Sequence, residues 1–187
     1  MSRIAGLIPK RNKGTPRLDA TTITRLLGTK QIVKDGFFFM ENQQSSAQLG
    51  SIQIVIDSSI FYAGDFPSPH KKLPDAQRVL LSISKIGIIR TLEKINGRFC
   101  LSVFDTKTNI LCLARDRFGL STLFYTCFDG LIAFSSRAKG LLGLPGVSNE
   151  LDHSFLKAAA ATNYRFLDTN NSLSPFRNIK QVPPGTI

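Results

Sequence analysis

The sequence predicts an α+β fold built on antiparallel sheets. The predicted strands fall into two runs separated by a pair of helices, rather than alternating with helices along the chain. The strands of the second run are joined by short turns, such as "TKTN" and Asp129-Gly130, which is typical of antiparallel hairpins. The length of 187 residues fits one domain, and a hydrophobic content of 42% is enough for a core.

The first run of predicted strands covers the N-terminal third. Residues 3–8, "RIAGLI", read as a short buried strand, and residues 21–27 as a short helix with Asp19 as a possible N-cap. Residues 31–66 read as mostly extended, with strands at "DGFFFM" and "SIQIVID". The alternation in "SIQIVID" puts two sets of side chains on opposite faces, namely Ile52, Ile54 and Ile56 on one and Gln53 and Asp57 on the other.

The period then becomes helical. Apolar residues recur at near-helical spacing after Pro74, which predicts two helices divided by Gly87. Asp75 is the expected N-cap of the first helix. The apolar residues are Val79, Leu80, Ile83 and Ile86 in the first helix and Ile89, Leu92 and Ile95 in the second. Asn96-Gly97 is expected to be a turn into four strands, "RFCLSVFD", "ILCLARD", "TLFYTCF" and "LIAFSS". A helix is expected from about Arg137, another at "DHSFLKAAAAT" with Asp152 as cap, and a loop-like tail.

Charge and cysteine content argue against nucleic-acid binding and against zinc or disulfide sites. The net charge is +11, and residues 1–34 carry eight basic side chains against one acid. No aromatic residue precedes Phe37, so a stacking platform for nucleic acid is missing, and a solvated basic face or an acidic partner domain is favoured over nucleic acid. The three cysteines lack CxxC spacing and are interpreted as buried reduced thiols rather than zinc ligands or disulfides.

Nothing in the sequence directs it to a membrane. "IAGLI" falls far short of the roughly 20 apolar residues of a transmembrane helix. Without an address signal, the expected location is the cytoplasm.

The stretch "INGRFCLSVFDTKTNILCLARDRFGLSTLFY" resembles the N-terminal domain of the asparagine synthetase family, a class II glutamine amidotransferase of the N-terminal-nucleophile (Ntn) hydrolase type. The family pattern is an Asn-Gly turn, a Phe-rich strand ending in Asp, Ala-Arg-Asp-x-x-Gly and a Leu-Tyr-Tyr strand. Its counterparts are Ile95-Asn96-Gly97, Phe99 to Asp105, Ala114 to Gly119 and Leu123-Phe124-Tyr125. The similarity is strong over residues 73–187 and weak over residues 9–72.

The resemblance implies a four-layer αββα sandwich of two antiparallel sheets, with residues 1–187 as one glutaminase-like domain. It also implies a partner, an ATP-dependent synthetase domain that uses ATP and Mg²⁺ to activate a carboxylate. The Ser-Gly-Gly-x-Asp-Ser phosphate loop of that domain is absent from these 187 residues. We therefore expect a fragment or one half of a split enzyme, with no cofactor held in this domain.

A glutaminase of this type uses its first mature residue as nucleophile. The free α-amino group, with a pKa of about 7.7–8.0, can serve as the base. The family begins Met-Cys-Gly-Ile, whereas this chain begins Met1-Ser2-Arg3-Ile4. Ser2 thus occupies the nucleophile position, and Arg3 adds a charged side chain where the family has Gly. Serine does occur as nucleophile in other Ntn hydrolases, so Ser2 by itself does not exclude activity.

The implied glutamine site differs at other positions too. The family's oxyanion donors lie in Val-Asn-Gly-Glu-Ile-Tyr, matched here by residues 56–61, so Asn becomes Asp57 and Gly becomes Ser58. An ionised Asp donates no hydrogen bond and repels an oxyanion. Asp75 matches the family's partner for the glutamine ammonium, although an N-cap explains it equally well and is favoured. The Arg-Gly-Pro segment has no counterpart, and Arg137 replaces a Glu.

Three functions remain open at this point. The first is a pseudo-glutaminase that serves as scaffold for an amide-forming ligase, as in the lasso-peptide cyclase and β-lactam synthetase branches, where the amine comes from a peptide or small-molecule substrate. The second is an active hydrolase that uses Ser2 on glutamine or another amide. The third is a basic binding module for nucleic acid or an acidic partner.

The remaining polar residues have structural interpretations. His70 and His153 are isolated and are expected to face solvent or cap helices. Arg115 and Asp116 are expected to form a buried structural pair. No pattern of metal ligands is present.

Overall fold

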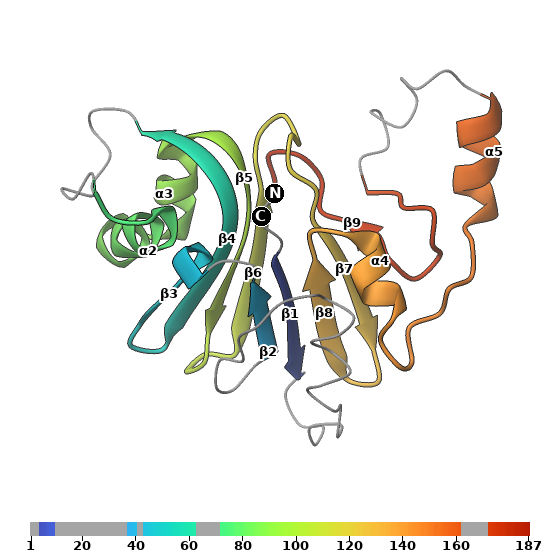
Figure 1. Ribbon diagram of the computed structural model, residues 1–187, viewed down its shortest axis with the longest axis horizontal. Coiled ribbons are helices and arrows are strands. Elements are labelled where there is room, and N and C mark those ends of the chain that lie inside the picture. The colour runs from blue at the N-terminus through green and yellow to red at the C-terminus, as the bar shows by residue number, and fades with distance from the viewer. Residues whose placement is uncertain (1–3, 10–36, 41–42, 63–71, 162–171) are drawn as a thin grey trace.

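Two antiparallel sheets stack face to face in the computed structural model (Figure 1), which describes residues 4–9, 37–40, 43–62, 72–161 and 172–187. The first sheet has the strand order β2-β1-β8-β7-β9. Its strands are β1 (Ile4–Pro9), β2 (Phe37–Met40), β7 (Phe124–Phe128), β8 (Leu131–Ser135) and β9 (Lys180–Gln181). The second sheet has the order β3-β4-β5-β6. It is built from β3 (Ser46–Leu49), β4 (Ile52–Tyr62), β5 (Ile95–Asp105) and β6 (Ile110–Arg115), with a 3-10 turn η1 (Gln43–Ser45) before β3.

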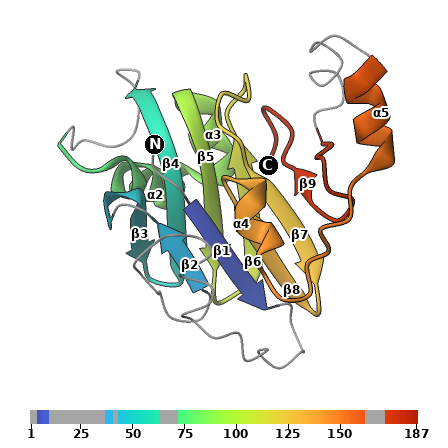
Figure 2. The same cartoon turned by 45° about the vertical axis from the view of Figure 1, so that its right-hand side comes forward.

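Helices cover the outer faces of both sheets (Figures 1 and 2). Helices α2 (Asp75–Ile86) and α3 (Ile88–Lys94) lie on the second sheet, and α4 (Ala138–Leu142) lies on the first. Helix α5 (His153–Ala161) stands away from the sandwich and buries none of its side chains. The layers therefore run helix, sheet, sheet, helix, which confirms the predicted αββα arrangement.

Three apolar clusters fill the spaces between these layers. Ile54, Ile56 and Val79 pack between the second sheet and α2. Ile4, Val55, Cys100 and Phe134 fill the space between the sheets, and Leu7, Ala133 and Leu141 lie between the first sheet and α4. The predicted alternation in β4 is confirmed, but its polar face is not solvated, because Gln53 and Asp57 are only 4% and 5% exposed.

The helical pair and the hairpins follow the sequence prediction closely. Gly87 separates α2 from α3 with a φ of 82°, and Asp152 caps α5 by accepting hydrogen bonds from the backbone N–H groups of Ser154 (2.8 Å) and Phe155 (3.0 Å). The predicted loop-like tail is wrong at one place, because β9 pairs with β7 there. The predicted helix at residues 21–27 and its cap Asp19 lie outside the described residues.

The predicted turn at Asn96-Gly97 is wrong. Both residues belong to β5 and pair with Phe61 and Ile60 of β4. Gly97 has a φ of 131°, and a Cβ at this position would lie 2.4 Å from the carbonyl oxygen of Ser59. Glycine is thus required here by a close strand–strand approach and not by a turn.

Replacing Gly97 by Ala is expected to lower the free energy of unfolding by about 1–2 kcal/mol, because the strained φ and the backbone clash cannot both relax. Urea denaturation measures this loss. Gly50→Ala is the matched control, since Gly50 also has a positive φ (58°) but its added Cβ would meet no atom within 4 Å. Equal losses in the two variants would contradict the close-approach explanation.

No helix among the described residues is long and apolar enough to span a bilayer.

Candidate functional site

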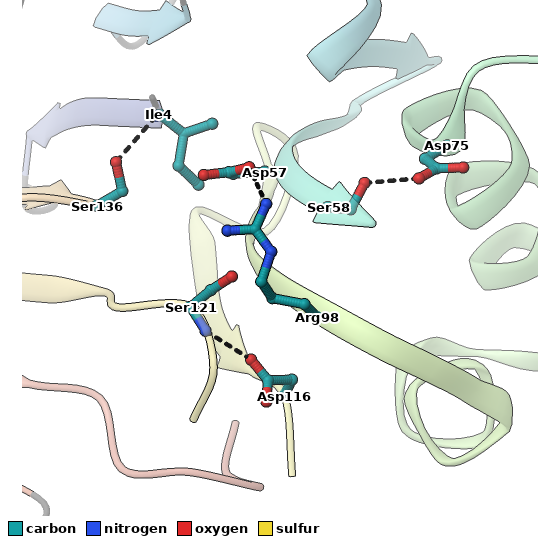
Figure 3. A network of polar contacts seen from close by, with 8 residues as sticks. All are labelled: Ile4, Asp57, Ser58, Asp75, Arg98, Asp116, Ser121 and Ser136. Atoms are coloured by element: carbon teal, nitrogen blue, oxygen red, sulfur yellow. Dashed lines mark hydrogen bonds and ion pairs between the residues drawn. The ribbon is translucent and has the colours of Figure 1, made fainter. Parts of the chain in front are cut away.

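Strand β4 divides the predicted site residues between its two faces (Figure 3). Adjacent residues of a strand point to opposite sides, so Asp57 and Ser58 cannot serve one pocket through their side chains. The Ser58 Oγ donates a 2.7 Å hydrogen bond to the Asp75 carboxylate on the helical side of the sheet. Asp57 faces the other way, into the space between the sheets. The structure therefore brings Ser58 and Asp75 together and separates them from Asp57.

Asp75 does not cap α2 as we predicted. Pro74 occupies the N-cap position, and no side chain makes a capping hydrogen bond there. Asp75 is the first residue of the helix, where a carboxylate is favoured by the helix dipole. Its hydrogen bond from Ser58 ties the start of α2 to the middle of β4.

Asp57 lies against Arg98 in the interior. The Arg98 guanidinium is 3.7 Å from an Asp57 carboxylate oxygen, with side-chain exposures of 33% for Arg98 and 7% for Asp57. Cys100 is the direct cross-strand neighbour of Asp57 on β5. Cys100 also packs in the same cluster as Ile4, the first residue of β1. Asp57 and Arg98 therefore lie beside the head of the first strand, next to the position that the resemblance assigns to the nucleophile (Figure 3).

The head of β1 is held in place by Ser136, the residue that follows β8. The backbone N–H of Ile4 donates to the Ser136 Oγ at 3.3 Å, and the Ser136 N–H donates to the Ile4 carbonyl at 2.9 Å. Arg137 follows as the exposed N-cap residue of α4. Ser2 and Arg3, which precede this anchored position, lie outside the described residues.

The three cysteines differ in environment. Cys100 is buried, Cys112 is half-buried and Cys127 is exposed, so the prediction of buried thiols holds for Cys100 and is wrong for Cys127. Burial raises the pKa of the Cys100 thiol far above its usual value, and the nearby Asp57 carboxylate raises it further. Burial also raises the pKa of Cys112.

Because the thiolate is the reactive form, the three thiols should react with Ellman's reagent in a fixed order at pH 8. We expect Cys127 to react first, Cys112 more slowly, and Cys100 only after denaturation. Cys127→Ser should remove the fast phase alone. A fast phase that survives in Cys127→Ser would contradict the assigned exposures.

Arg115 and Asp116 are buried and structural, but they do not form the predicted ion pair within the described residues. The Arg115 guanidinium donates to three carbonyl oxygens, those of Ser121, Gly119 (2.6 Å) and Val182 (3.0 Å). The Asp116 carboxylate accepts from three backbone N–H groups, those of Phe118 (3.1 Å), Leu120 (2.9 Å) and Ser121 (3.0 Å). Each side chain thus satisfies backbone groups of the loop before β7.

The described part of the chain holds no group of three His, Cys, Asp or Glu side chains placed to bind a metal ion. His153 is exposed on α5, as predicted. His70 lies outside the described residues.

Comparison with known families decides which class of domain this is. The family profile described as "Glutamine amidotransferase domain" matches residues 69–187. The chain belongs to this family. The αββα layers and the relatives below place it with the class II amidotransferase domains of the asparagine synthetase family.

The relatives of this amidotransferase domain are asparagine synthetases. Asparagine synthetase (glutamine-hydrolysing) 3 of Bacillus subtilis is 35% identical over 97 residues, covering 50% of this chain and 15% of that protein. Asparagine synthetase (glutamine-hydrolysing) 2 of Bacillus subtilis is 28% identical over 147 residues, covering 73% of this chain and 19% of that protein. Among solved structures, the glutamine phosphoribosylpyrophosphate amidotransferase of Bacillus subtilis aligns with a TM-score of 0.41 and 12% identity, covering 74% of this chain and 36% of that one. The aligned segments span less than a fifth of the length of these two synthetases.

Arg98 is the residue of this site that sequence reasoning missed. In "RFCLSVFD" the alternation puts Arg98 and Cys100 on one face of the strand, and Cys100 is an apolar, inward-facing residue. An arginine on the inward face requires a partner. The sequence pattern could have indicated that Arg98 needs a partner, but only the register between β4 and β5 identifies Asp57 as that partner.

Proposed function

We propose that this amidotransferase domain does not hydrolyse glutamine and acts as the scaffold of an ATP-dependent amide-forming enzyme. The observation that carries the proposal is the Asp57–Arg98 pair at the head of β1. The family resemblance assigns an oxyanion donor to position 57, and an ionised carboxylate cannot donate.

The surrounding contacts support the same conclusion. Arg98 lies against the Asp57 carboxylate, so this position carries an internal ion pair rather than an open amide donor. The Ser58 and Asp75 side chains bind each other on the far face of β4. In the family, Asp75 would bind the glutamine ammonium, whereas here it ties a helix to a strand. The changes at the nucleophile and at the oxyanion donor thus occur together with the loss of the Arg-Gly-Pro segment.

The partner we propose is a synthetase-type domain on the same or a separate chain. The matched asparagine synthetases are more than five times as long as their matched segments, which leaves room for such a domain. ATP and Mg²⁺ would be bound by that partner. In the cyclisation of a peptide or natural product the amine would come from that partner's own substrate, whereas in asparagine synthesis it would be free ammonia.

An electrophilic glutamine analogue tests the proposal. The diazoketone analogue of glutamine alkylates an activated N-terminal nucleophile, and intact-mass spectrometry detects the adduct. We expect no adduct on the protein, and none on a Ser2→Cys variant, because the missing Arg-Gly-Pro segment and the Ser58–Asp75 hydrogen bond leave the glutamine analogue without its binding groups. An adduct on Ser2 that is absent from Ser2→Ala would show that the site is functional.

A further inference from the structure

The inner face of the β4–β5 pair opens to solvent beyond Asp57. Asp57 is 5% exposed. The next cross-strand pair on this face is Ser59 with Arg98, and the one after it is Phe61 with Asn96. Exposure rises along the series, from 33% for the Arg98 side chain to 75% for Phe61. Arg98 therefore lies at the boundary between the interior and the solvent.

The Arg98 guanidinium has hydrogen-bonding capacity that the described residues do not use. Its ion pair with Asp57, at 3.7 Å, is longer than a hydrogen bond. Within the described part of the chain, no hydrogen bond reaches this guanidinium. Because a guanidinium carries five N–H donors in a planar fork, it can bind ligand oxygens on the side away from Asp57.

Ser121 supplies a second donor beside Arg98. Its loop lies next to that residue, because the Asp116 N–H donates to the Phe99 carbonyl at 3.0 Å and the Asp116 carboxylate accepts from the Ser121 N–H at 3.0 Å. Ser121 is only 4% exposed, yet its Oγ has no hydrogen-bond partner among the described residues. In Figure 3 this hydroxyl points toward the Arg98 guanidinium. Buried hydroxyls are normally hydrogen-bonded, so one that faces a guanidinium with unused donors indicates a ligand site.

The chemistry of the two groups selects a carboxylate. The guanidinium and the hydroxyl both donate, and the net charge of +11 favours an anion over a cation. A carboxylate matches the planar fork of Arg98 and can be held by two parallel hydrogen bonds. Asp57 on the other side of Arg98 repels a doubly charged ligand more than a singly charged one, which disfavours phosphate.

Exposed apolar side chains lie on both sides of the two donors. Phe61 is the diagonal neighbour of Arg98 across the β4–β5 pair, at a separation that aromatic side chains can bridge. Leu120 precedes Ser121 and is 64% exposed. Its N–H donates to the Asp116 carboxylate at 2.9 Å, so the loop is already ordered and binding costs little further entropy. A carboxylate on Arg98 thus has apolar surface beside it for the group that it carries.

We propose that Arg98 and Ser121 form a binding site for a monocarboxylate that carries an aromatic or aliphatic group, with the carboxylate on the two donors and the apolar group between Phe61 and Leu120. Binding there breaks no bond in the ligand.

The probe is sodium 3-phenylpropionate, titrated into the ¹⁵N-labelled protein at low salt. We expect saturable shift changes at the Arg98 Nε–H and the Ser121 amide, with a dissociation constant of about 1 mM for a ligand of this size. 3-Phenylpropan-1-ol keeps the ring but lacks the carboxylate, and inorganic phosphate lacks the ring. Each should bind at least about tenfold more weakly than 3-phenylpropionate.

The tripeptide acetyl-Ala-Ala-Phe presents the same carboxylate and ring at the C-terminus of a peptide. Tighter binding of the tripeptide would assign the site to peptide C-termini, and tighter binding of 3-phenylpropionate would assign it to small acids.

Protein variants separate binding from folding. Arg98→Met should weaken binding of 3-phenylpropionate by about tenfold or more, and Arg98→Lys by several-fold, because lysine keeps the charge but loses the fork. Ser121→Ala should weaken binding by about fivefold and leave the urea midpoint unchanged or higher, because it removes a buried hydroxyl that has no partner. A purely structural serine would instead lower the midpoint. Arg177→Met removes an exposed arginine elsewhere and should bind like the wild type.

Three outcomes would overturn the proposal. They are no binding of 3-phenylpropionate at about 10 mM, equally tight binding of 3-phenylpropan-1-ol, and binding that Arg98→Met and Ser121→Ala both leave unchanged. Ser121→Ala keeps the test available should Arg98→Met not fold. None of these results bears on glutamine hydrolysis, because the probe contains no amide, so the proposed function is tested separately.

Discussion

Replacing Asp116 by Asn should lower the free energy of unfolding by about 3 kcal/mol. The Asp116 carboxylate is 1% exposed and accepts three backbone hydrogen bonds, from Phe118, Leu120 and Ser121. Asn keeps the shape of the Asp side chain but has one acceptor oxygen in place of two. Its NH₂ group would face a backbone N–H, which would then have no acceptor. Buried donors that lose a charged acceptor cost about 1–3 kcal/mol each.

The readouts for Asp116→Asn are urea denaturation and hydrogen exchange of the Leu120 and Ser121 amides, which should accelerate. Asp152→Asn is the matched control. Asp152 also accepts from two backbone N–H groups, but as the cap of the exposed helix α5, where Asn caps as well as Asp. The control should change stability by less than about 0.5 kcal/mol. An equally small effect at Asp116 would contradict its role in holding the loop.

Replacing Arg98 by Met is expected to cost about 2 kcal/mol. Asp57 is 5% exposed, and the substitution removes its ion-pair partner at 3.7 Å. Breaking a fully buried pair costs about 3–5 kcal/mol, but Arg98 is one-third exposed, so solvent screening reduces the figure. Adding Asp57→Asn to Arg98→Met should restore part of the loss, because the buried carboxylate that faced Arg98 is removed.

A double-mutant cycle on Asp57 and Arg98 should give a coupling of at least about 1 kcal/mol. The control is Arg177→Met. Its ion pair with Glu150 is shorter, at 2.8 Å, but both side chains are more than half exposed. Surface pairs contribute little, so we expect a change below about 0.5 kcal/mol. A coupling near zero for Asp57 and Arg98 would mean that their proximity has no energetic consequence.

The sequence predicted those parts of the fold that depend on local periodicity. The helical spacing after Pro74, the division at Gly87 and the hairpin at Asp129-Gly130 are all confirmed. The turn at Asn96-Gly97 is wrong because the same dipeptide serves equally for a turn or for a close approach between strands. Only the pairing with β4 distinguishes the two.

The candidate site could be predicted less well, because it too depends on how strands pair and not on local periodicity. The resemblance assigns Asp57, Ser58 and Asp75 to one glutamine site, yet strand alternation points Asp57 away from Ser58 and Asp75. Arg98 lies 41 residues beyond Asp57 in the sequence, and it becomes a neighbour only through the β4–β5 register. Long-range contacts of this kind have no local signal.

The most direct test of the proposed loss of glutamine hydrolysis is ammonia release from glutamine by the purified protein with Met1 removed, compared with Ser2→Ala and Ser2→Cys. We predict the same background rate in all three, since restoring a thiol at position 2 does not restore a donor at position 57. Turnover above that background that disappears in Ser2→Ala would contradict the account.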